Sequence, residues 1–350
     1  MTALLPDPLE YVPYREVRGR PNIIVDGPPQ DATVLTLSHW PVNTTPDSLK
    51  RDTSTATVFA YLDAPSLHAH AECVSNNHFD EDGLFSMFAL HQPETAIEHR
   101  ELLQDAALAG DFGTYTDLEA ARLCFVIEAF ADQRTSPLPP GTFAGCERQQ
   151  VASLYRRMLD RLPEILVDID GFKACWSEPD AHLAESEALI ADGRVKIEEY
   201  PELDLAVVMI PEDLSMRTVR RYLQSEQGAV HPFAIHNATD CNRIIRAQGG
   251  RLEFQYRYDS WLQVVSRRPL LRADLSALAE RLNAIESAHG TWRSEKITQV
   301  VPRLYLEGTE KSELPLERFI DEVRAYLTTA PVAWDPYDWD SRAMSDRDEC

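Results

Sequence analysis

The sequence lacks any long apolar run, and this absence excludes one class of protein at the outset. No stretch of its 350 residues approaches the roughly 18 consecutive apolar residues that a membrane span requires. The first residues, MTALLPDPLEYVPYREV, also lack the basic start and apolar core of an export signal. We therefore expect a soluble, cytoplasmic protein without a membrane partner.

Paired cysteines and dense basic clusters are missing as well. The six cysteines are widely separated and include no CxxC pair, so their spacing predicts neither a zinc knuckle nor a redox dithiol.

The formal net charge is −23, and no cluster of Lys and Arg offsets it. Such a charge repels a phosphate backbone, which excludes duplex nucleic acid as an expected partner. A nucleotide or a short oligonucleotide is not excluded, because bound metal ions can reverse the local field.

The local signatures of several enzyme classes are also absent. The chain contains no GxGxxG, no GxxxxGK[ST], no HExxH and no GxSxG. The motifs therefore give no support to a nucleotide-cofactor enzyme, a P-loop enzyme, a zincin or a serine hydrolase.

The sequence does contain an alternation of short strands and helices. The runs NIIVDG, ATVLTLSHW and HAECVSN are rich in β-branched and apolar residues, and we interpret them as buried strands. A capped amphipathic helix is expected between the second and third of them, and helical spacing follows the third in GLFSMFALHQ, PETAIEHRELLQDAALAG and TDLEAARLCFVIEAFADQ. Strand, helix, strand is the unit of a parallel sheet, so we predict an α/β fold with a mainly parallel sheet flanked by helices.

A segment rich in proline and glycine, TSPLPPGTFAGC, divides the chain. After it we expect helices in RQQVASLYRRMLDRLPEIL and MRTVRRYLQSE, and strands in DLAVVMIP, PFAIHNA and GRLEFQYRYDSWLQVV. These elements predict a second, smaller α/β lobe. The predicted organisation is an arm at residues 1–20, an α/β domain at 21–140, a helical connection and second lobe at 141–332, and a disordered acidic tail at 333–350.

The densest group of polar side chains is NNHFDEDG, which follows the strand HAECVSN and precedes a helix. Alternate side chains of an extended segment point the same way, so His78, Asp80 and Asp82 are expected to converge. An imidazole with two carboxylates suits Mn²⁺, Mg²⁺, Zn²⁺ or Fe²⁺, and open α/β sheets bind ligands at the carboxyl ends of their strands. The alternative is an ordinary strand-to-helix turn, in which Asp80 or Asp82 caps the helix.

Further residues are candidates for such a site. Asn77 lies within the same polar segment, and His39 ends the preceding strand, so it should emerge at the same sheet edge. The alternative for His39 is a histidine that is hydrogen-bonded in a turn. In HPFAIHNATD, His231 and His236 flank a predicted strand of the second lobe. Either one could approach a shared cleft or lie in the core.

The segment NNHFDEDGLFSMFAL resembles the first motif of the DHH phosphoesterase superfamily, in which a strand ends in a His-x-Asp-x-Asp turn and runs into a helix. The resemblance covers residues 76–90, and the Asp-His-His motif that names the superfamily is absent. It implies a two-lobed α/β phosphoesterase with a pair of Mn²⁺-type ions bound by His78, Asp80 and Asp82. It also implies a metal role for Asp111, where the superfamily has a further aspartate after its second strand. The alternative is a loop aspartate between two helices.

The leading hypothesis is a metal-dependent hydrolase of the phosphoesterase type, acting on a small phosphoester, nucleotide or short oligonucleotide. Mn²⁺ is the expected cofactor, with Mg²⁺ or Zn²⁺ as alternatives, and activation of water by the metal removes the need for a side-chain nucleophile. Arg243, Arg251 and Arg257 are candidates to bind substrate phosphates, although exposed strand arginines are usually just solvated. The second hypothesis is a catalytically silent α/β protein that binds a ligand or a protein partner, and the missing adjacent histidines favour it.

Overall fold

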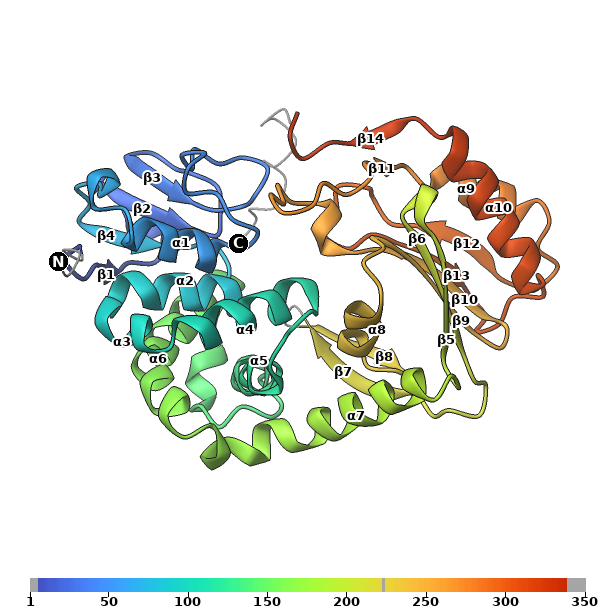
Figure 1. Cartoon of the computed structure of the whole chain (residues 1–350), viewed down its shortest axis with the longest axis horizontal. Helices are drawn as coiled ribbons and strands as arrows, with labels where there is room; N and C mark the ends of the chain where they lie inside the picture. The colour runs from blue at the N-terminus through green and yellow to red at the C-terminus, as the bar shows by residue number, and fades with distance from the viewer. Residues whose placement is uncertain (1–5, 222–223, 339–350) are drawn as a thin grey trace.

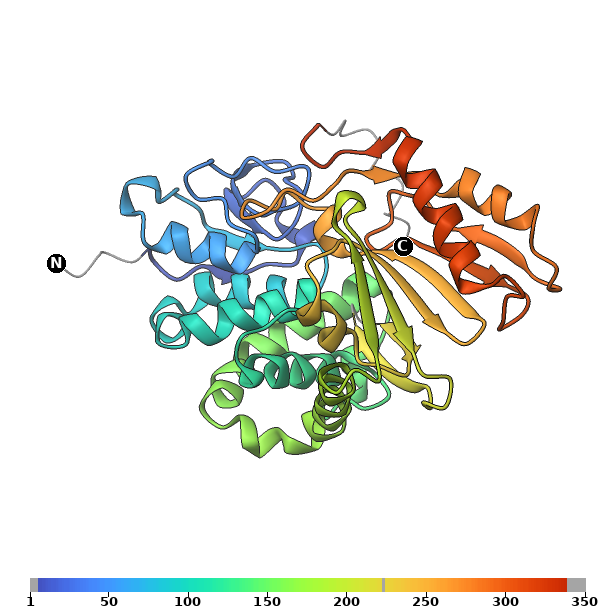
Figure 2. The same ribbon diagram turned by 45° about the vertical axis from the view of Figure 1, so that its right-hand side comes forward.

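The computed structural model describes residues 6–221 and 224–338, which form two lobes (Figures 1 and 2). We call residues 6–194 the first lobe and the described residues from 195 onward the second lobe. The fold is α/β, as the sequence predicts. The first lobe contains a parallel sheet, and the other sheets are mixed or antiparallel.

The sheet of the first lobe has four strands. They are β1 (Glu10–Tyr11), β2 (Asn22–Val25), β3 (Thr33–Leu37) and β4 (Cys73–Ser75). Their order in the sheet is β1-β4-β2-β3, so the predicted N-terminal arm contributes an edge strand. Every residue of β2 and β4 is buried, which is typical of parallel strands covered on both faces. Because the strands are parallel, their carboxyl ends meet at one edge of the sheet.

Helices cover this sheet and fill the rest of the first lobe (Figure 1). They are α1 (Ser54–Leu62), α2 (Glu81–His91), α3 (Pro93–Glu98), α4 (Arg100–Phe112), α5 (Leu118–Ala131), α6 (Glu147–Val167) and α7 (Lys173–Ala191). Helix α2 is buried from its first residue to Leu90 and packs against α1 and α4. This central position explains why its sequence is apolar on nearly all sides. Helix α6, in the predicted helical connection, packs its apolar face on the same core.

The second lobe contains a six-stranded sheet with two helices packed on it. Its strands are β5 (Lys196–Tyr200), β6 (Leu205–Ile210), β9 (Arg243–Gln248), β10 (Arg251–Tyr256), β12 (Thr291–Ser294) and β13 (Arg303–Glu307), in the order β12-β13-β10-β9-β6-β5. Only β6 and β9 pair in parallel. Helices α9 (Ser276–Asn283) and α10 (Leu316–Thr329) share an apolar core with this sheet.

Three elements of the second lobe differ from the sequence predictions. The strand predicted in GRLEFQYRYDSWLQVV ends at Tyr256 and is followed by a 3₁₀ turn at Tyr258–Ser260. The predicted helix in MRTVRRYLQSE is an antiparallel pair of strands, β7 (Arg217–Arg221) and β8 (Gln224–Gly228). Buried residues of β7 alternate with more exposed ones, and the β-branched residues at 218 and 219 favour a strand. The predicted strand in PFAIHNA is helix α8 (Pro232–Ala238). Here His231 caps the helix and proline takes its first position, which is a typical helix start.

The end of the described chain returns to the region between the lobes. Strand β14 (Val332–Trp334) pairs with β11 (Arg272–Ala273), and the ring of Trp334 stacks on that of Trp261 with centroids 5.8 Å apart. The prediction of a disordered tail from 333 is therefore wrong at its start, because the apolar surface of Trp334 is buried. Residues 339–350 of that prediction lie outside the described residues. None of the described helices is long and apolar enough to cross a membrane.

Candidate metal centre

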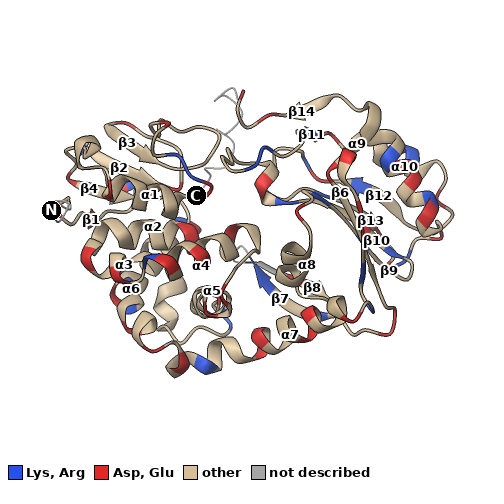
Figure 3. Cartoon of the chain, in the orientation of Figure 1, with Lys and Arg blue, Asp and Glu red and all other residues tan. Residues whose placement is uncertain are grey.

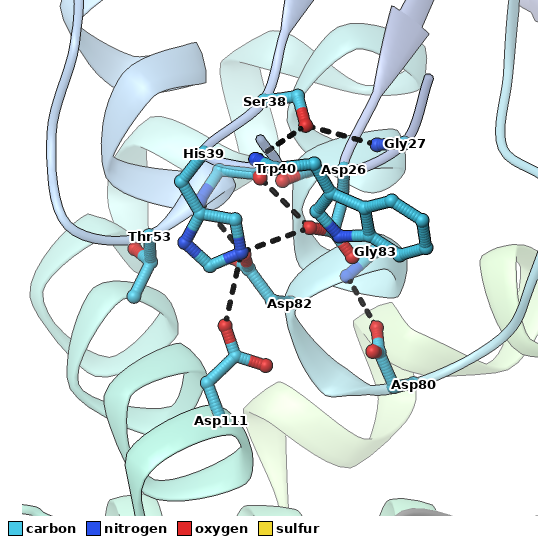
Figure 4. A network of polar contacts seen from close by, with 12 residues as sticks. Asp26, Gly27, Ser38, His39, Trp40, Thr53, Asp80, Asp82, Gly83 and Asp111 are labelled. Atoms are coloured by element: carbon cyan, nitrogen blue, oxygen red, sulfur yellow. Dashed lines mark hydrogen bonds and ion pairs between the residues drawn. The ribbon is translucent and has the colours of Figure 1, made fainter. Parts of the chain in front are cut away.

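Polar side chains gather where strands β2, β3 and β4 end at one edge of the first sheet (Figure 4). Asp26 directly follows β2, and His39 and His78 lie two and three residues after β3 and β4. Asp80 and Asp82 belong to the start of α2, and Asp111 comes from the last turn of α4. We call this set the Asp/His cluster, and it consists of Asp26, His39, His78, Asp80, Asp82 and Asp111. The sheet edge that the sequence predicts as a ligand site thus does collect acidic and histidine side chains.

One part of the cluster is fully enclosed. The Nε2 atom of His39 lies 3.2 Å from Asp26 Oδ1, 3.6 Å from Asp82 Oδ2 and 3.5 Å from Asp111 Oδ2. The side chains of these four residues are at most 3% exposed. We call them the inner group.

The other part of the cluster reaches the surface. The Nε2 atom of His78 lies 3.2 Å from Asp26 Oδ2 and 2.8 Å from Asp80 Oδ2. The side chain of His78 is 29% exposed and that of Asp80 is 13% exposed. We call Asp26, His78 and Asp80 the outer group. Asp26 belongs to both groups and faces each with a different oxygen.

Both histidines are oriented by hydrogen bonds from their other ring nitrogen. The Nδ1 atom of His39 lies 2.5 Å from the backbone oxygen of Asp52, and that of His78 lies 3.2 Å from Asn77 Oδ1. In both rings Nδ1 therefore donates, and Nε2 is directed toward the carboxylates. Histidines that bind metals are held in this way. Asn77, a candidate from the sequence, thus contacts His78 rather than the carboxylates.

The spacing of the polar atoms suits a metal ion. Neighbouring ligands on an ion with bonds of about 2.1 Å lie roughly 3.0–3.4 Å apart, depending on the geometry. The contacts within the cluster, from 2.8 to 3.6 Å, fall around this range. Moreover, His39 Nε2 and Asp26 Oδ2 are buried and make no well-aligned hydrogen bond with a described residue. The inner and the outer group could each hold a metal ion.

Two helix N-termini hold the carboxylates in place. The backbone N–H groups of Ser54 and Thr55, in the first turn of α1, donate to the two oxygens of Asp82, both at 2.7 Å. The hydroxyl of Ser54 donates to Asp26 Oδ1 at 2.9 Å. Asp80 caps α2 by accepting the N–H of Gly83 at 2.8 Å. The partial positive charge of a helix N-terminus stabilises each carboxylate. Asp80 and Asp82 thus accept hydrogen bonds from helix N-termini and also belong to the cluster.

Burial and mutual repulsion raise the pKa of several acids of this region. Burial, followed by the charge of Asp82, raises the pKa of Asp111 well above its usual range. Burial and the charge of Asp26 raise the pKa of Asp82 to about 6. Burial and Asp80 raise the pKa of the neighbouring Glu81 to about 8. These carboxylates repel one another, so a cation placed among them would be stabilised.

The histidines offset part of this repulsion. Burial opposes charge on His39, but the contacts with Asp26 and Asp82 outweigh it and raise the pKa of His39 to about 9. Likewise, Asp80 and Asp26 overcome burial and raise the pKa of His78 well above its usual value. Burial opposes charge on Asp26, but its contacts with His39 and His78 outweigh the burial and lower the pKa of Asp26. Without a metal ion, protons on the two imidazoles therefore take the place of a cation.

The histidines of α8 lie outside the cluster. His231 caps α8 through its Nδ1 atom, and its ring packs against those of Phe125 and His182. The Nδ1 atom of His236 lies 2.9 Å from the backbone oxygen of Phe112, the residue after Asp111. His236 is therefore next to the cluster without joining it.

The three arginines that the sequence singles out lie in different places. Arg257 donates to the backbone oxygen of Phe112 at 3.2 Å, beside the cluster. Arg243 donates to the backbone oxygens of residues 203 and 271, and Arg251 forms an exposed pair with Glu310. Arg221, which sequence reasoning missed, donates to the backbone oxygen of Asp111 at 3.0 Å. It belongs to β7, a strand that Figure 3 shows as basic.

The sequence predictions also missed Asp26, the residue shared by both groups. It directly follows NIIV, a run that the sequence correctly predicts as a strand. The rule that selected His39, the position just after a strand, would have selected Asp26 as well. Asp111 is in the cluster, but it lies in the last turn of α4, neither after a strand nor in a loop between helices.

Almost the whole chain matches the model of a protein family. The model of DUF6687, a family of unknown function, matches residues 7–338. The chain belongs to this family. The match includes both lobes and all six residues of the Asp/His cluster. No curated protein and no solved structure matches the chain.

Proposed function

We propose that this protein is a metal-dependent hydrolase of the phosphoesterase type that acts on a small phosphoester, a nucleotide or a short oligonucleotide. The observation that carries the proposal is the carboxylate of Asp26, whose two oxygens face two different histidines. A carboxylate between two ligand groups suits a pair of ions. Two-metal sites are common in phosphatases and nucleases.

The donor atoms favour Mn²⁺, with Mg²⁺ or Zn²⁺ as alternatives. Four carboxylates provide hard oxygen ligands, which suit Mg²⁺ and Mn²⁺, and two imidazoles shift the preference toward transition metals. Such ions would supply an activated water and neutralise charge on a phosphoryl group. The chain would position them through Asp26, the two histidines and the helix N-termini that hold the carboxylates.

Positive charge next to the cluster supports an anionic substrate. Arg221 and Arg257 both donate to backbone oxygens at the end of α4, one residue apart. Together with burial, these cations lower the pKa of His236 well below its usual value, so its imidazole is neutral. Arg257 also pairs with Asp259, but the two guanidinium groups together offset part of the negative charge of the cluster beside Asp111.

Burial limits the size of the group that reacts. The inner group is enclosed, and only His78 and Asp80 reach the surface. A substrate would therefore approach from the side of His78 with a narrow group such as a terminal phosphate. This geometry is the reason for proposing a small phosphoester rather than a bulky one.

To test the proposal, the protein is loaded with Mn²⁺ and assayed for hydrolysis of chromogenic phosphomonoesters and phosphodiesters. Nucleotides and short oligonucleotides are assayed next. We expect Asp26→Asn to lose more activity than the roughly 10–100-fold that changes outside the ligand shell cost. Asp31→Asn is the matched control, because Asp31 is exposed and belongs to the loop after β2. Metal binding without turnover of any of these compounds would contradict the proposal and favour a protein that only binds its ligand.

A further inference from the structure

We propose that the two ligand groups hold two ions that are not equivalent: the inner ion is enclosed by the second lobe, and the outer ion exchanges with solvent. We also propose that Asp52 is a positioning residue that links the inner ion to the second lobe. The inference rests on the proposed function in one respect, because both require the Asp/His cluster to bind metal.

The difference in burial between the groups is the first support. The imidazole of His39 is completely buried, whereas 29% of the His78 side chain is exposed. Asp82 is also completely buried, whereas Asp80 is 13% exposed. An ion in the outer group can thus exchange a ligand for water at the surface. An ion in the inner group cannot do so unless the surrounding protein moves.

The second lobe supplies part of the cover over the inner group. The ring of Tyr258, in the short 3₁₀ turn Tyr258–Ser260, lies edge-on to the ring of His39, with centroids 6.2 Å apart. The ring of Phe112, from the first lobe, lies at the same distance from His39. Phe112 and Tyr258 belong to one apolar cluster with Trp40 and Trp261. Separation of the lobes would therefore uncover His39.

Asp52 joins the inner group to the second lobe by hydrogen bonds. Its backbone oxygen accepts from His39 Nδ1 at 2.5 Å. Its carboxylate oxygen Oδ1 accepts the backbone N–H groups of Val265 and Ser266, at 2.7 and 2.8 Å. The backbone N–H of Gln263 also donates to the backbone oxygen of His39, at 2.9 Å. A single residue of the first lobe thus binds both the imidazole of His39 and a loop of the second lobe.

Among the described residues, the ring of the outer histidine makes no hydrogen bond to the second lobe. The Nδ1 atom of His78 bonds to Asn77, the preceding residue, and its Nε2 atom faces Asp26 and Asp80 of its own lobe. The ring of Trp40, also in the first lobe, packs on it with centroids 5.1 Å apart. Trp40 in turn contacts Trp261 of the second lobe, with centroids 5.0 Å apart. The hydrogen bonds of the His78 ring nevertheless stay within the first lobe, so loss of the Asp52 contact should leave the polar geometry of the outer group unchanged.

A buried ring nitrogen distinguishes the inner group from an ordinary cluster of acidic residues. His39 Nε2 is directed at three carboxylates and makes no well-aligned hydrogen bond with a described residue. With Nδ1 committed to Asp52, Nε2 is the ring atom that faces the inner group, and it offers a lone pair when an ion displaces its proton. A buried lone pair among carboxylates is suited to a cation.

The experiment measures the release of Mn²⁺ without any substrate. Protein loaded with Mn²⁺ and freed of excess ion is mixed with a colorimetric chelator, and release is followed with time. We expect two phases of one equivalent each, with rates at least tenfold apart. His78→Gln should lose the fast phase and keep the slow one.

Asp52→Ala tests the positioning role. It keeps the backbone oxygen that binds His39 but removes the carboxylate that holds the second lobe, so we expect the slow phase to accelerate at least tenfold while the fast phase stays unchanged. Asp47→Ala is the matched control, because Asp47 lies in the same loop, is 94% exposed and pairs only with Lys50 among the described residues. A merely structural effect of Asp52 would alter both phases. If Asp52→Ala does not fold, the His78→Gln result decides whether the ions differ.

Each outcome separates this inference from the proposed function. Release in a single phase, or equal acceleration of both phases in Asp52→Ala, overturns the inference and leaves a hydrolase in place. Release in two phases by a protein without hydrolytic activity supports the inference and contradicts the hydrolase. A protein that binds no Mn²⁺, Mg²⁺ or Zn²⁺ overturns both.

Discussion

Asp82 Oδ1 accepts the backbone N–H of Thr55 at 2.7 Å, so a member of the Asp/His cluster also closes the N-terminus of helix α1. The N–H of Ser54 donates to the other oxygen of the same carboxylate. Both N–H groups belong to buried residues, and loss of the carboxylate would leave them without a partner. Asp82 is therefore structural whether or not a metal is bound.

We predict that Asp82→Ala lowers the free energy of unfolding by about 2–4 kcal/mol in the presence of EDTA, because two buried donors lose their acceptor. Urea denaturation measures this effect. Asp117→Ala is the control: Asp117 caps α5 through Glu119 N at an exposed site, where a lost cap costs about 1 kcal/mol. A loss at Asp82 no larger than the loss at Asp117 would contradict the prediction.

Metal binding should depend on pH, because protons occupy the site in the metal-free protein. The pKa of His39 is about 9, so below that pH an ion must displace a proton from its imidazole. We predict that the apparent affinity for Mn²⁺ rises from pH 6 to pH 9 and then levels off. Titration calorimetry in buffers of different ionisation enthalpy should detect released protons at pH 7. An affinity that does not change over this range would be inconsistent with the protonated cluster.

Gly83 allows the start of α2 to pack against the cluster. A Cβ atom at this position would lie 2.5 Å from Asn76 Nδ2, 2.6 Å from Tyr155 Oη and 3.0 Å from Asp80 Oδ1. We predict that Gly83→Ala costs about 1–3 kcal/mol of stability and weakens metal binding, because Asp80 must move. Thermal unfolding and Mn²⁺ titration measure the two effects. Gly141→Ala, where a Cβ would meet nothing within 4 Å, should change neither.

His231 should make the protein sensitive to acid. Burial lowers the pKa of this histidine to about 3, from an ordinary value of 6.5, so the unfolded chain binds its proton first as the pH falls. The contribution of neutral His231 to the free energy of unfolding is thus complete above pH 6.5 and is lost progressively as the pH falls toward 3. At pH 5 the loss amounts to about 2 kcal/mol.

His231→Asn tests this dependence, since asparagine keeps a cap for α8 and does not titrate. We predict that the difference in unfolding free energy between pH 8 and pH 5 shrinks by about 2 kcal/mol in the variant. His289→Asn is the control, because His289 is exposed. An unchanged difference in His231→Asn would show that acid acts through other groups.

The first lobe was more predictable from the sequence than the second. NIIV and TVLTL form short parallel strands, the first fully buried and the second buried over its last three residues, and burial gives such strands their apolar runs. The position after a strand then identifies His39 and the NNHFDEDG segment. In contrast, the arginines of β7 suit a helix surface as well as a strand, and the strand depends on pairing with β8 in addition to the β-branched residues at 218 and 219.

Asp111 marks the limit of reasoning from local patterns. It reaches the cluster from the end of a helix, and its place depends on how α4 packs against α2. Gly113, with a left-handed backbone at φ 67°, ends α4 just after it, close to Arg221 and His236. Such long-range contacts leave no periodic signal in the sequence. The same holds for Asp52, whose partners lie more than 200 positions further along the chain.

The large separation in sequence between Asp52 and its partners also affects the order in which the lobes form during synthesis. All six residues of the cluster lie within positions 26–111, whereas Val265 and Ser266 are synthesised much later. Domains generally fold from the N-terminus during synthesis, so the first lobe can assemble before its cover exists. In a growing chain, the cover that Tyr258 gives to His39 is therefore still absent, and an ion of the kind proposed could enter the inner group without separation of the lobes. We expect the ion that is present during synthesis to be the one that the inner group retains.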